Sequence, residues 1–84
     1  MRQCYFCGRT DTLERHHIFQ GAYRKKSEQY GFVVDLCHDH HNEPPDGVHF
    51  NRTNNLELKR MAQEQFEQNR TREEFRGLFG KSYL

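Results

Sequence analysis

The chain has few cysteines and no long apolar run. Three cysteines among 84 residues are an odd number, and no positively charged start followed by an apolar stretch marks a secretory signal. No segment approaches the roughly 20 apolar residues that a membrane span requires. We therefore expect a cytoplasmic protein without a membrane partner, whose cysteines serve as thiolate ligands in a reducing compartment rather than as disulfides.

Apolar residues are also few, and neither sign of charge is in large excess. Only 33% of the chain is apolar and 30% is charged, and the mean hydropathy is -1.15. A single domain of residues 1–84 buries too little to be stable on its core alone, and such domains usually need disulfides, a metal or a partner. Thirteen basic and twelve acidic residues leave a net charge of +1, so net charge by itself does not indicate a nucleic-acid binder.

Residue patterning predicts two strands followed by two helices. Strand candidates cover 13–19 and 32–37, and the second is rich in β-branched and aromatic residues. The residues between them, 22–31, form a basic and polar connection. An apolar stripe at helical spacing predicts a helix over 54–68. A capping-box pattern with a second stripe predicts another helix over 71–79.

Two pairs of metal-ligating residues are the most informative feature of the chain. Cys4 and Cys7 are separated by two residues, and so are Cys37 and His40. Sulfur and imidazole are donors that zinc prefers, and pairs at this spacing close a tight knuckle around one tetrahedral ion. We therefore predict one structural Zn²⁺ held by these four residues. His41 is an alternative fourth ligand, but the spacing of His40 repeats that of the first pair.

Two adjacent histidines, His16 and His17, lie between the knuckles. Neighbouring strand residues point to opposite faces, so the two imidazoles do not duplicate one role. One can hold a divalent metal while the other acts as a base, since an unperturbed imidazole titrates at about pH 6.5. Such a pair on a surface strand is often without function. Its position ahead of the second knuckle and of His41 favours a functional interpretation.

In this order, the pattern resembles the HNH endonucleases. The resemblance covers about residues 4–50 and implies an α+β fold, with a small ββα-metal (His-Me finger) core, a structural zinc and, in this chain, a helical extension over about 54–79. Small proteins of this kind are frequent in bacteriophages and mobile elements. The matching segments are Cys4-x-x-Cys7, Leu13-x-x-His16-His17-Ile18 and Val33-Val34-Asp35-Leu36-Cys37-x-x-His40-His41-Asn42.

The resemblance also implies a role for each imidazole. By position, His16 matches the family's ligand to the catalytic metal, His17 its general base, and His41 the metal ligand at the start of the family helix. The implied ion is Mg²⁺ or Mn²⁺. The implied reaction is hydrolysis of a phosphodiester bond in DNA that leaves a 5′ phosphate and a 3′ hydroxyl.

The chain departs from the family pattern at two places. Phe32 stands where the family's middle asparagine, which mainly holds the loop between the strands, usually lies. Residues 38–43 predict a helical turn, but Pro44 and Pro45 interrupt the helix on which the family often places a further ligand. His49 follows this interruption and is a candidate third ligand to the catalytic ion. The alternative is a loop or packed histidine.

A short basic cluster and a competing function complete the predictions. Arg24, Lys25 and Lys26 are candidate phosphate contacts, with a solvated loop as the alternative.

The competing function is a non-catalytic zinc module that binds nucleic acid or protein, which the missing asparagine and the near-zero charge favour. The retained histidines oppose it. Cleavage of both DNA strands would require a homodimer or two nicks, and a larger phage or host complex is a further possible assembly.

Overall fold

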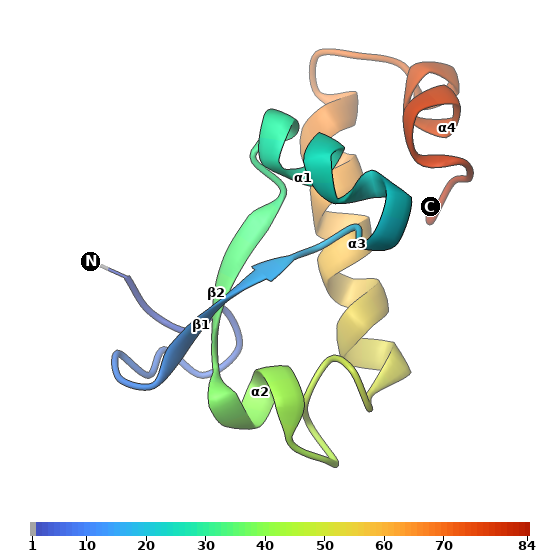
Figure 1. Cartoon of the computed structure of the whole chain (residues 1–84). Helices are drawn as coiled ribbons and strands as arrows, with labels where there is room; N and C mark the ends of the chain where they lie inside the picture. Colours follow the sequence, from blue (N-terminus) through green and yellow to red (C-terminus); the bar gives the residue numbers. More distant parts are fainter. Residues whose placement is uncertain (1) are drawn as a thin grey trace.

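The structure, a computed structural model, describes residues 2–84. A two-stranded antiparallel sheet and four α-helices form the fold of this segment, which confirms an α+β class (Figure 1). The strands are β1, Leu13–His17, and β2, Val33–Cys37. Their register sets His16 opposite Val34 and Leu13 opposite Cys37. The histidine pair and the second knuckle therefore lie at opposite ends of one ribbon.

The connection between the strands is helical. A 3-10 turn, η1, covers Gly21–Tyr23, and α1 covers Arg24–Tyr30. Most of α1 consists of straight-chain residues that lose little side-chain freedom in a helix. Gly31 ends it in the left-handed region at φ 74°, where glycine carries no steric penalty. The segment is too short to show an apolar period, which explains why patterning indicated only a polar connection.

The three later helices agree closely with their predictions. α2 covers His38–Asn42 and ends before the two prolines. α3 covers Arg52–Glu67; it begins two residues earlier than predicted, because the Asn51 side chain accepts a hydrogen bond from the backbone N–H of Asn54 at 2.9 Å. α4 covers Arg72–Phe79, and the predicted capping box at its start is present.

An aromatic core joins α1, α3 and α4 at the end of α3 remote from α2 (Figure 1). The Phe19 and Phe79 rings are 4.5 Å apart at their centroids, and Phe75 and Phe79 are 4.9 Å apart. Phe32 belongs to this core and is only 4% exposed. The family's asparagine position is thus a packing position in this chain.

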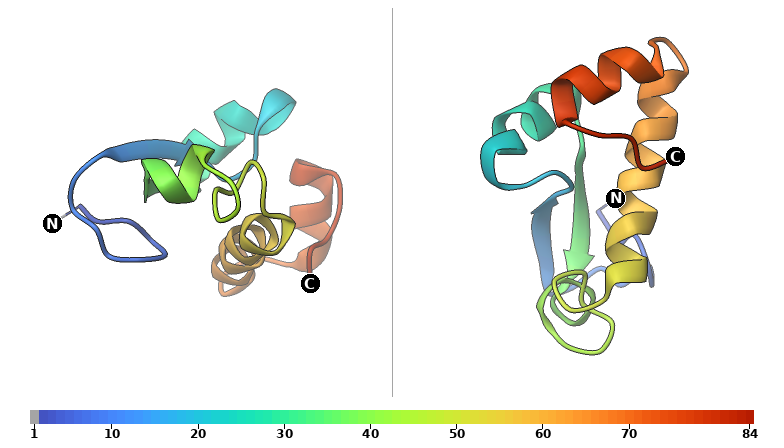
Figure 2. Two further views of the ribbon diagram at one scale, coloured as in Figure 1. Left: turned by 90° about the horizontal axis from the view of Figure 1, so that it is seen from below. Right: turned by 90° about the vertical axis from the view of Figure 1, so that its right-hand side faces the viewer.

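The predicted stripe of α3 faces this core, with Leu58, Ala62 and Phe66 all buried. Gln63 is buried as well, and its side-chain oxygen accepts a hydrogen bond from the Tyr83 backbone N–H at 2.7 Å. This contact holds the C-terminal segment as it returns toward α3 (Figure 2). Among residues 2–84, no helix has the length and apolarity needed to cross a bilayer.

Candidate metal centres

The first candidate centre brings together Cys4, Cys7, Cys37 and His40, the four residues of the two knuckles. Cys7 Sγ lies 3.8 Å from Cys37 Sγ. His40 Nδ1 lies 3.2 Å from Cys37 Sγ and 3.9 Å from Cys4 Sγ. A tetrahedral zinc separates two sulfurs by about 3.8 Å and a sulfur from a nitrogen by about 3.6 Å, given its usual bond lengths. The cluster is therefore compatible with a zinc site.

Local backbone structure builds this thiol cluster. Cys4 N–H donates to the Arg9 carbonyl at 2.8 Å and Gly8 N–H donates to the Cys4 carbonyl at 2.9 Å, so the first knuckle is a closed turn. Tyr5 N–H donates to the Asp35 carbonyl at 2.9 Å, which ties this turn to β2. Cys37 ends β2 and His40 lies on the first turn of α2. Three separate segments thus converge on one point.

The two buried thiols differ in their electrostatics. Burial would raise the pKa of Cys4, but backbone hydrogen bonds from Cys37, Cys7 and Phe6 outweigh it and lower that pKa overall. Burial raises the pKa of Cys37. Backbone N–H groups directed at a sulfur stabilise its thiolate, which is the form that binds a metal.

The structure places His40, not His41, with the thiols. Successive residues of a helix are rotated by about 100°, so the two imidazoles of α2 face different directions. The Phe6 ring stacks on His40 with centroids 5.6 Å apart. The geometry therefore agrees with His40, the predicted fourth ligand, and not with the alternative, His41.

The second candidate centre consists of His16, His41 and His49, whose ligand nitrogens lie within 4.8 Å of one another. His16 comes from β1, His41 from α2 and His49 from the loop that follows the two prolines. Their ring centroids are 4.9 to 5.5 Å apart. His16 is 1% exposed, and its Nε2 has no hydrogen-bond partner in the part of the chain that is described. An unpartnered buried nitrogen is costly, and an ion or a water bound among the three rings would supply its partner.

Neighbouring polar groups orient the imidazoles of this centre. Glu14 Oε1 lies 2.7 Å from His41 Nδ1, which leaves Nε2 to face the centre. The Gln20 amide lies 3.4 Å from His16 Nδ1, the nitrogen opposite the unpartnered one. A carboxylate or amide behind a ligating histidine is the usual means of fixing its ring in metal sites.

Electrostatics keep two of these imidazoles neutral near pH 7. Burial, followed by the neighbouring His41 and His49, lowers the pKa of His16 to about 3. Burial and His41 also lower the pKa of His49. A neutral imidazole retains the lone pair that binds a metal.

Gly47 allows the loop to bring His49 back to the centre. A Cβ atom at this position would lie 2.7 Å from both the backbone nitrogen and the oxygen of Glu43. Gly47 N–H donates to the Glu43 carbonyl at 2.7 Å, and Val48 N–H donates to the His40 carbonyl at 2.8 Å. The loop thus packs backbone to backbone against the end of α2, and any side chain would prevent this approach.

The donor set of this centre does not suit Mg²⁺. Mg²⁺ takes oxygen ligands, and Mn²⁺ is also best served by carboxylate, carbonyl and water, whereas imidazole suits Zn²⁺, Cu²⁺, Fe²⁺ and Ni²⁺. All three donors here are imidazole nitrogens. The cluster therefore fits a transition ion, and the expectation of Mg²⁺ or Mn²⁺, which came from the family resemblance, has no support in these residues.

His17, the predicted base, lies outside both clusters. Its Nε2 is 2.7 Å from Glu28 Oε2, and its side chain is 14% exposed. Its ring lines two shallow cavities, one with Gln20 and Arg24 and the other with Arg24, Lys25 and Glu28. The adjacent His16 faces the buried centre, as expected from strand alternation.

The predicted basic cluster divides between two environments. Arg24 and Lys25 line the cavity beside His17. Lys26 instead donates a hydrogen bond from Nζ to the Leu78 carbonyl at 2.8 Å, and it lies 5.6 Å from the centroid of the Tyr23 ring. Lys26 thus ties α1 to the end of α4.

Sequence reasoning missed several residues that support these sites. Ser27 is fully buried; its Oγ donates to the Phe19 carbonyl at 2.7 Å and accepts from the Phe19 N–H at 3.0 Å. It therefore holds the chain after β1, the task expected of the absent asparagine. Glu14 behind His41 and Glu28 beside His17 were also missed. No local pattern marks any of the three, since each acts through a contact distant in sequence.

Comparison of the chain with protein-family models, curated proteins and solved structures found no match. The function of this chain is therefore inferred from its own residues and their geometry.

Proposed function

We propose that this chain is a metal-dependent endonuclease of the HNH type, which hydrolyses phosphodiester bonds in DNA. In this proposal β1, β2 and α2 form its ββα-metal core. The observation that carries it is a three-imidazole cluster, in which the buried His16 has one unpartnered nitrogen, with His17 as the next residue of β1. A buried nitrogen without a partner costs free energy of folding, and an ion bound at His16 would offset that cost.

The cavities beside His17 support a phosphate ligand. Arg15, Arg24 and Lys25 line the same cavity as His17, beside the carboxylate of Glu28. A nucleic-acid backbone entering it would therefore meet three cations and one anion beside the proposed base. Such contacts supply affinity that falls with rising salt. The near-zero net charge then reflects the balance of the whole domain, not that of this cavity.

Each residue has a defined task in the proposed reaction. His17 accepts a proton from water as the water oxygen bonds to phosphorus, and the bond from phosphorus to the 3′ oxygen breaks. His16, His41 and His49 would hold the ion that, when bound, neutralises charge on the phosphate and the departing oxygen. The 3′ oxygen then takes a proton from solvent, which leaves a 5′ phosphate and a 3′ hydroxyl.

The thiol cluster has a structural role in this proposal. Zinc held by Cys4, Cys7, Cys37 and His40 would join the N-terminal turn to β2 and α2. Structural zinc contributes on the order of 10 kcal/mol to folding in small domains. It would take no part in the chemistry, because it lies among four protein donors with no open position.

Nicking of a supercoiled plasmid tests the proposal. The parent protein, loaded with Zn²⁺, Co²⁺ or Ni²⁺ in turn, should nick DNA, and His17→Ala should not. A panel of linear, branched and single-stranded DNA, with RNA beside it, would define the substrate. If the parent protein binds these nucleic acids with both centres loaded and cuts none of them, the chain is a zinc module.

A further inference from the structure

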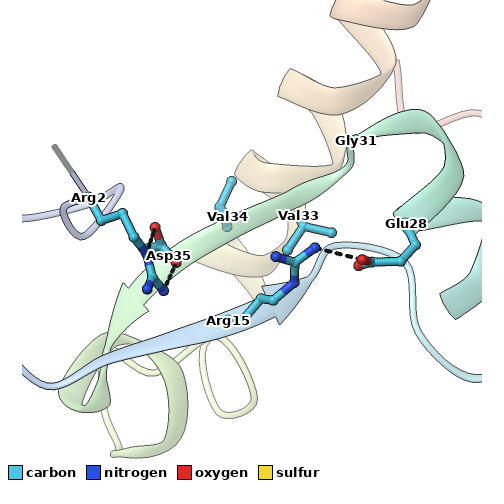
Figure 3. A pocket seen from close by; sticks show the side chains of 7 residues that line it. All are labelled: Arg2, Arg15, Glu28, Gly31, Val33, Val34 and Asp35. Carbon is cyan, nitrogen blue, oxygen red and sulfur yellow. Dashed lines mark hydrogen bonds and ion pairs between the residues drawn. The ribbon is translucent and has the colours of Figure 1, made fainter.

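Glu28 is the acidic residue closest to the proposed base, and it comes from a different element. One of its oxygens, Oε2, lies 2.7 Å from His17 Nε2. The other, Oε1, lies 2.6 Å from Arg15 Nη2. Figure 3 marks this ion pair with a dashed line between the two side chains. Arg15 and His17 are two residues apart on β1, so they share one face of the strand. A single carboxylate on α1 therefore spans both.

This bridge selects one form of the imidazole. Hydrogen bonds from Arg15 and, more weakly, from His17 lower the pKa of Glu28, so the carboxylate is ionised near pH 7. An ionised carboxylate only accepts hydrogen bonds. His17 Nε2 must therefore carry the hydrogen, and Nδ1 is left as the basic nitrogen of the neutral ring. Arg15 holds the other oxygen and so limits rotation of the carboxylate.

We propose that Glu28 is a positioning residue for His17, held in turn by Arg15, and that it fixes the tautomer in which Nδ1 accepts the proton from water. This inference rests on the proposed nuclease function and adds to it a group outside both metal centres. In other catalytic histidines, too, a carboxylate holds one ring nitrogen while the other nitrogen accepts the proton.

A purely structural role for Glu28 is the competing explanation, in which it only fastens α1 to β1 through Arg15. The Glu28 side chain is 49% exposed, and ion pairs at exposed positions contribute little to folding stability. The two roles are therefore separable. Substitution of Glu28 should leave the thermal midpoint and the metal content close to those of the parent while changing the state of the His17 ring.

The first test observes the ring directly. In a ¹⁵N-labelled protein loaded with diamagnetic Zn²⁺, we expect the His17 nitrogen shifts to report hydrogen on Nε2. In Glu28→Gln the amide can either donate or accept, so the shifts should report a mixture of tautomers. Glu73→Gln, an exposed substitution on α4, is the matched control and should leave the His17 signals unchanged. Hydrogen on Nδ1 in the parent would overturn the proposal.

The second test measures cleavage of a defined DNA substrate. Loss of the group that orients a metal-ligating histidine typically costs about 10- to 100-fold. On the same scale, Glu28→Gln should lower kcat by at least about tenfold with KM nearly unchanged. The kcat of Glu28→Ala should fall further and recover partly in added formate, because Glu28 lines one cavity together with Arg15 and His17, where a small carboxylate would meet the same two partners. Glu73→Gln should cut at the parent rate.

The outcomes separate this inference from the nuclease proposal. A parent protein that cuts DNA while Glu28→Gln keeps both the parent rate and the parent tautomer refutes the positioning role alone. A parent that cuts no nucleic acid refutes the nuclease proposal and any catalytic meaning of Glu28 with it. In that case the ring tautomer still decides whether Glu28 holds His17.

Discussion

Replacement of Gly47 by alanine should disrupt the imidazole centre formed by His16, His41 and His49, although Gly47 is not one of its ligands. The added Cβ would lie 2.7 Å from two backbone atoms of Glu43, a distance well inside van der Waals contact. Neither atom belongs to a flexible side chain, so the loop itself must move. Its movement strains the hydrogen bonds from Gly47 to Glu43 and from Val48 to His40, at 2.7 and 2.8 Å. His49 follows within two residues and would leave its place beside His16.

The cost of this substitution has two parts. Overpacking of a close contact typically costs about 1–3 kcal/mol, and weakening of one backbone hydrogen bond adds about 1 kcal/mol. We expect the free energy of unfolding to fall by about 2–4 kcal/mol, which lowers Tm by about 10 °C or more in a domain of this size. Withdrawal of one imidazole should also weaken ion binding at the centre by at least about tenfold.

Gly77→Ala is the matched control, since a Cβ at that position would meet nothing within 4 Å. Gly77 lies within α4, where alanine is favoured over glycine by about 1 kcal/mol. This variant should therefore raise Tm and bind ions like the parent. Thermal unfolding followed by circular dichroism, with Co²⁺ titration followed by visible absorption, checks both variants. A Gly47→Ala protein with parent Tm and parent Co²⁺ affinity would refute the packing account of this loop.

Three further predictions concern the metals and pH. Purified protein should contain one tightly held zinc, and Cys37→Ser or a strong chelator should abolish helical circular dichroism; full helicity without zinc would contradict this. Calorimetry on zinc-loaded protein should find that the imidazole centre binds Co²⁺ or Ni²⁺ far more tightly than Mg²⁺, and His16→Ala and His41→Ala should each weaken that binding; equal affinity for Mg²⁺ would show that the donor set is misassigned. With no ion at this centre, the free energy of unfolding should fall as pH drops below about 6.5. In the unfolded chain His16 takes up a proton there, whereas in the folded protein its pKa is lowered to about 3 and it stays neutral. His16→Leu should reduce that slope, and an unchanged slope would assign it to other groups.

Local signals in the sequence predicted much of the fold. The two strands follow from short runs, the second rich in β-branched and aromatic residues, and α3 follows from its apolar period. The capping box at Thr71 and Glu74 marks the start of α4. The ligand pairs were recognisable because each lies within one turn of chain. The position of His40, rather than His41, beside the thiols also agrees with the spacing of the second pair, which repeats that of the first.

Other features depend on contacts that no local pattern reveals. The return of His49 to the centre depends on Gly47 packing against the backbone of Glu43, which residue types alone do not indicate. α1 carries too few apolar residues to show a period, and so the contact of Glu28 with β1 was also hidden. The expectation of Mg²⁺ or Mn²⁺ came from the family resemblance, and the three imidazole donors that the structure brings together do not support it.

The most direct test of the central claim compares parent and His17→Ala proteins in the plasmid-nicking assay, at equal zinc content and with the imidazole centre loaded. General-base catalysis is typically worth about 10²–10⁴ in rate, so His17→Ala should cut at least about 100-fold more slowly while retaining its fold, its metals and its DNA affinity. Excess metal ion should partly rescue His16→Ala and His41→Ala but not His17→Ala. Equal nicking by the parent and all three variants would contradict the nuclease assignment.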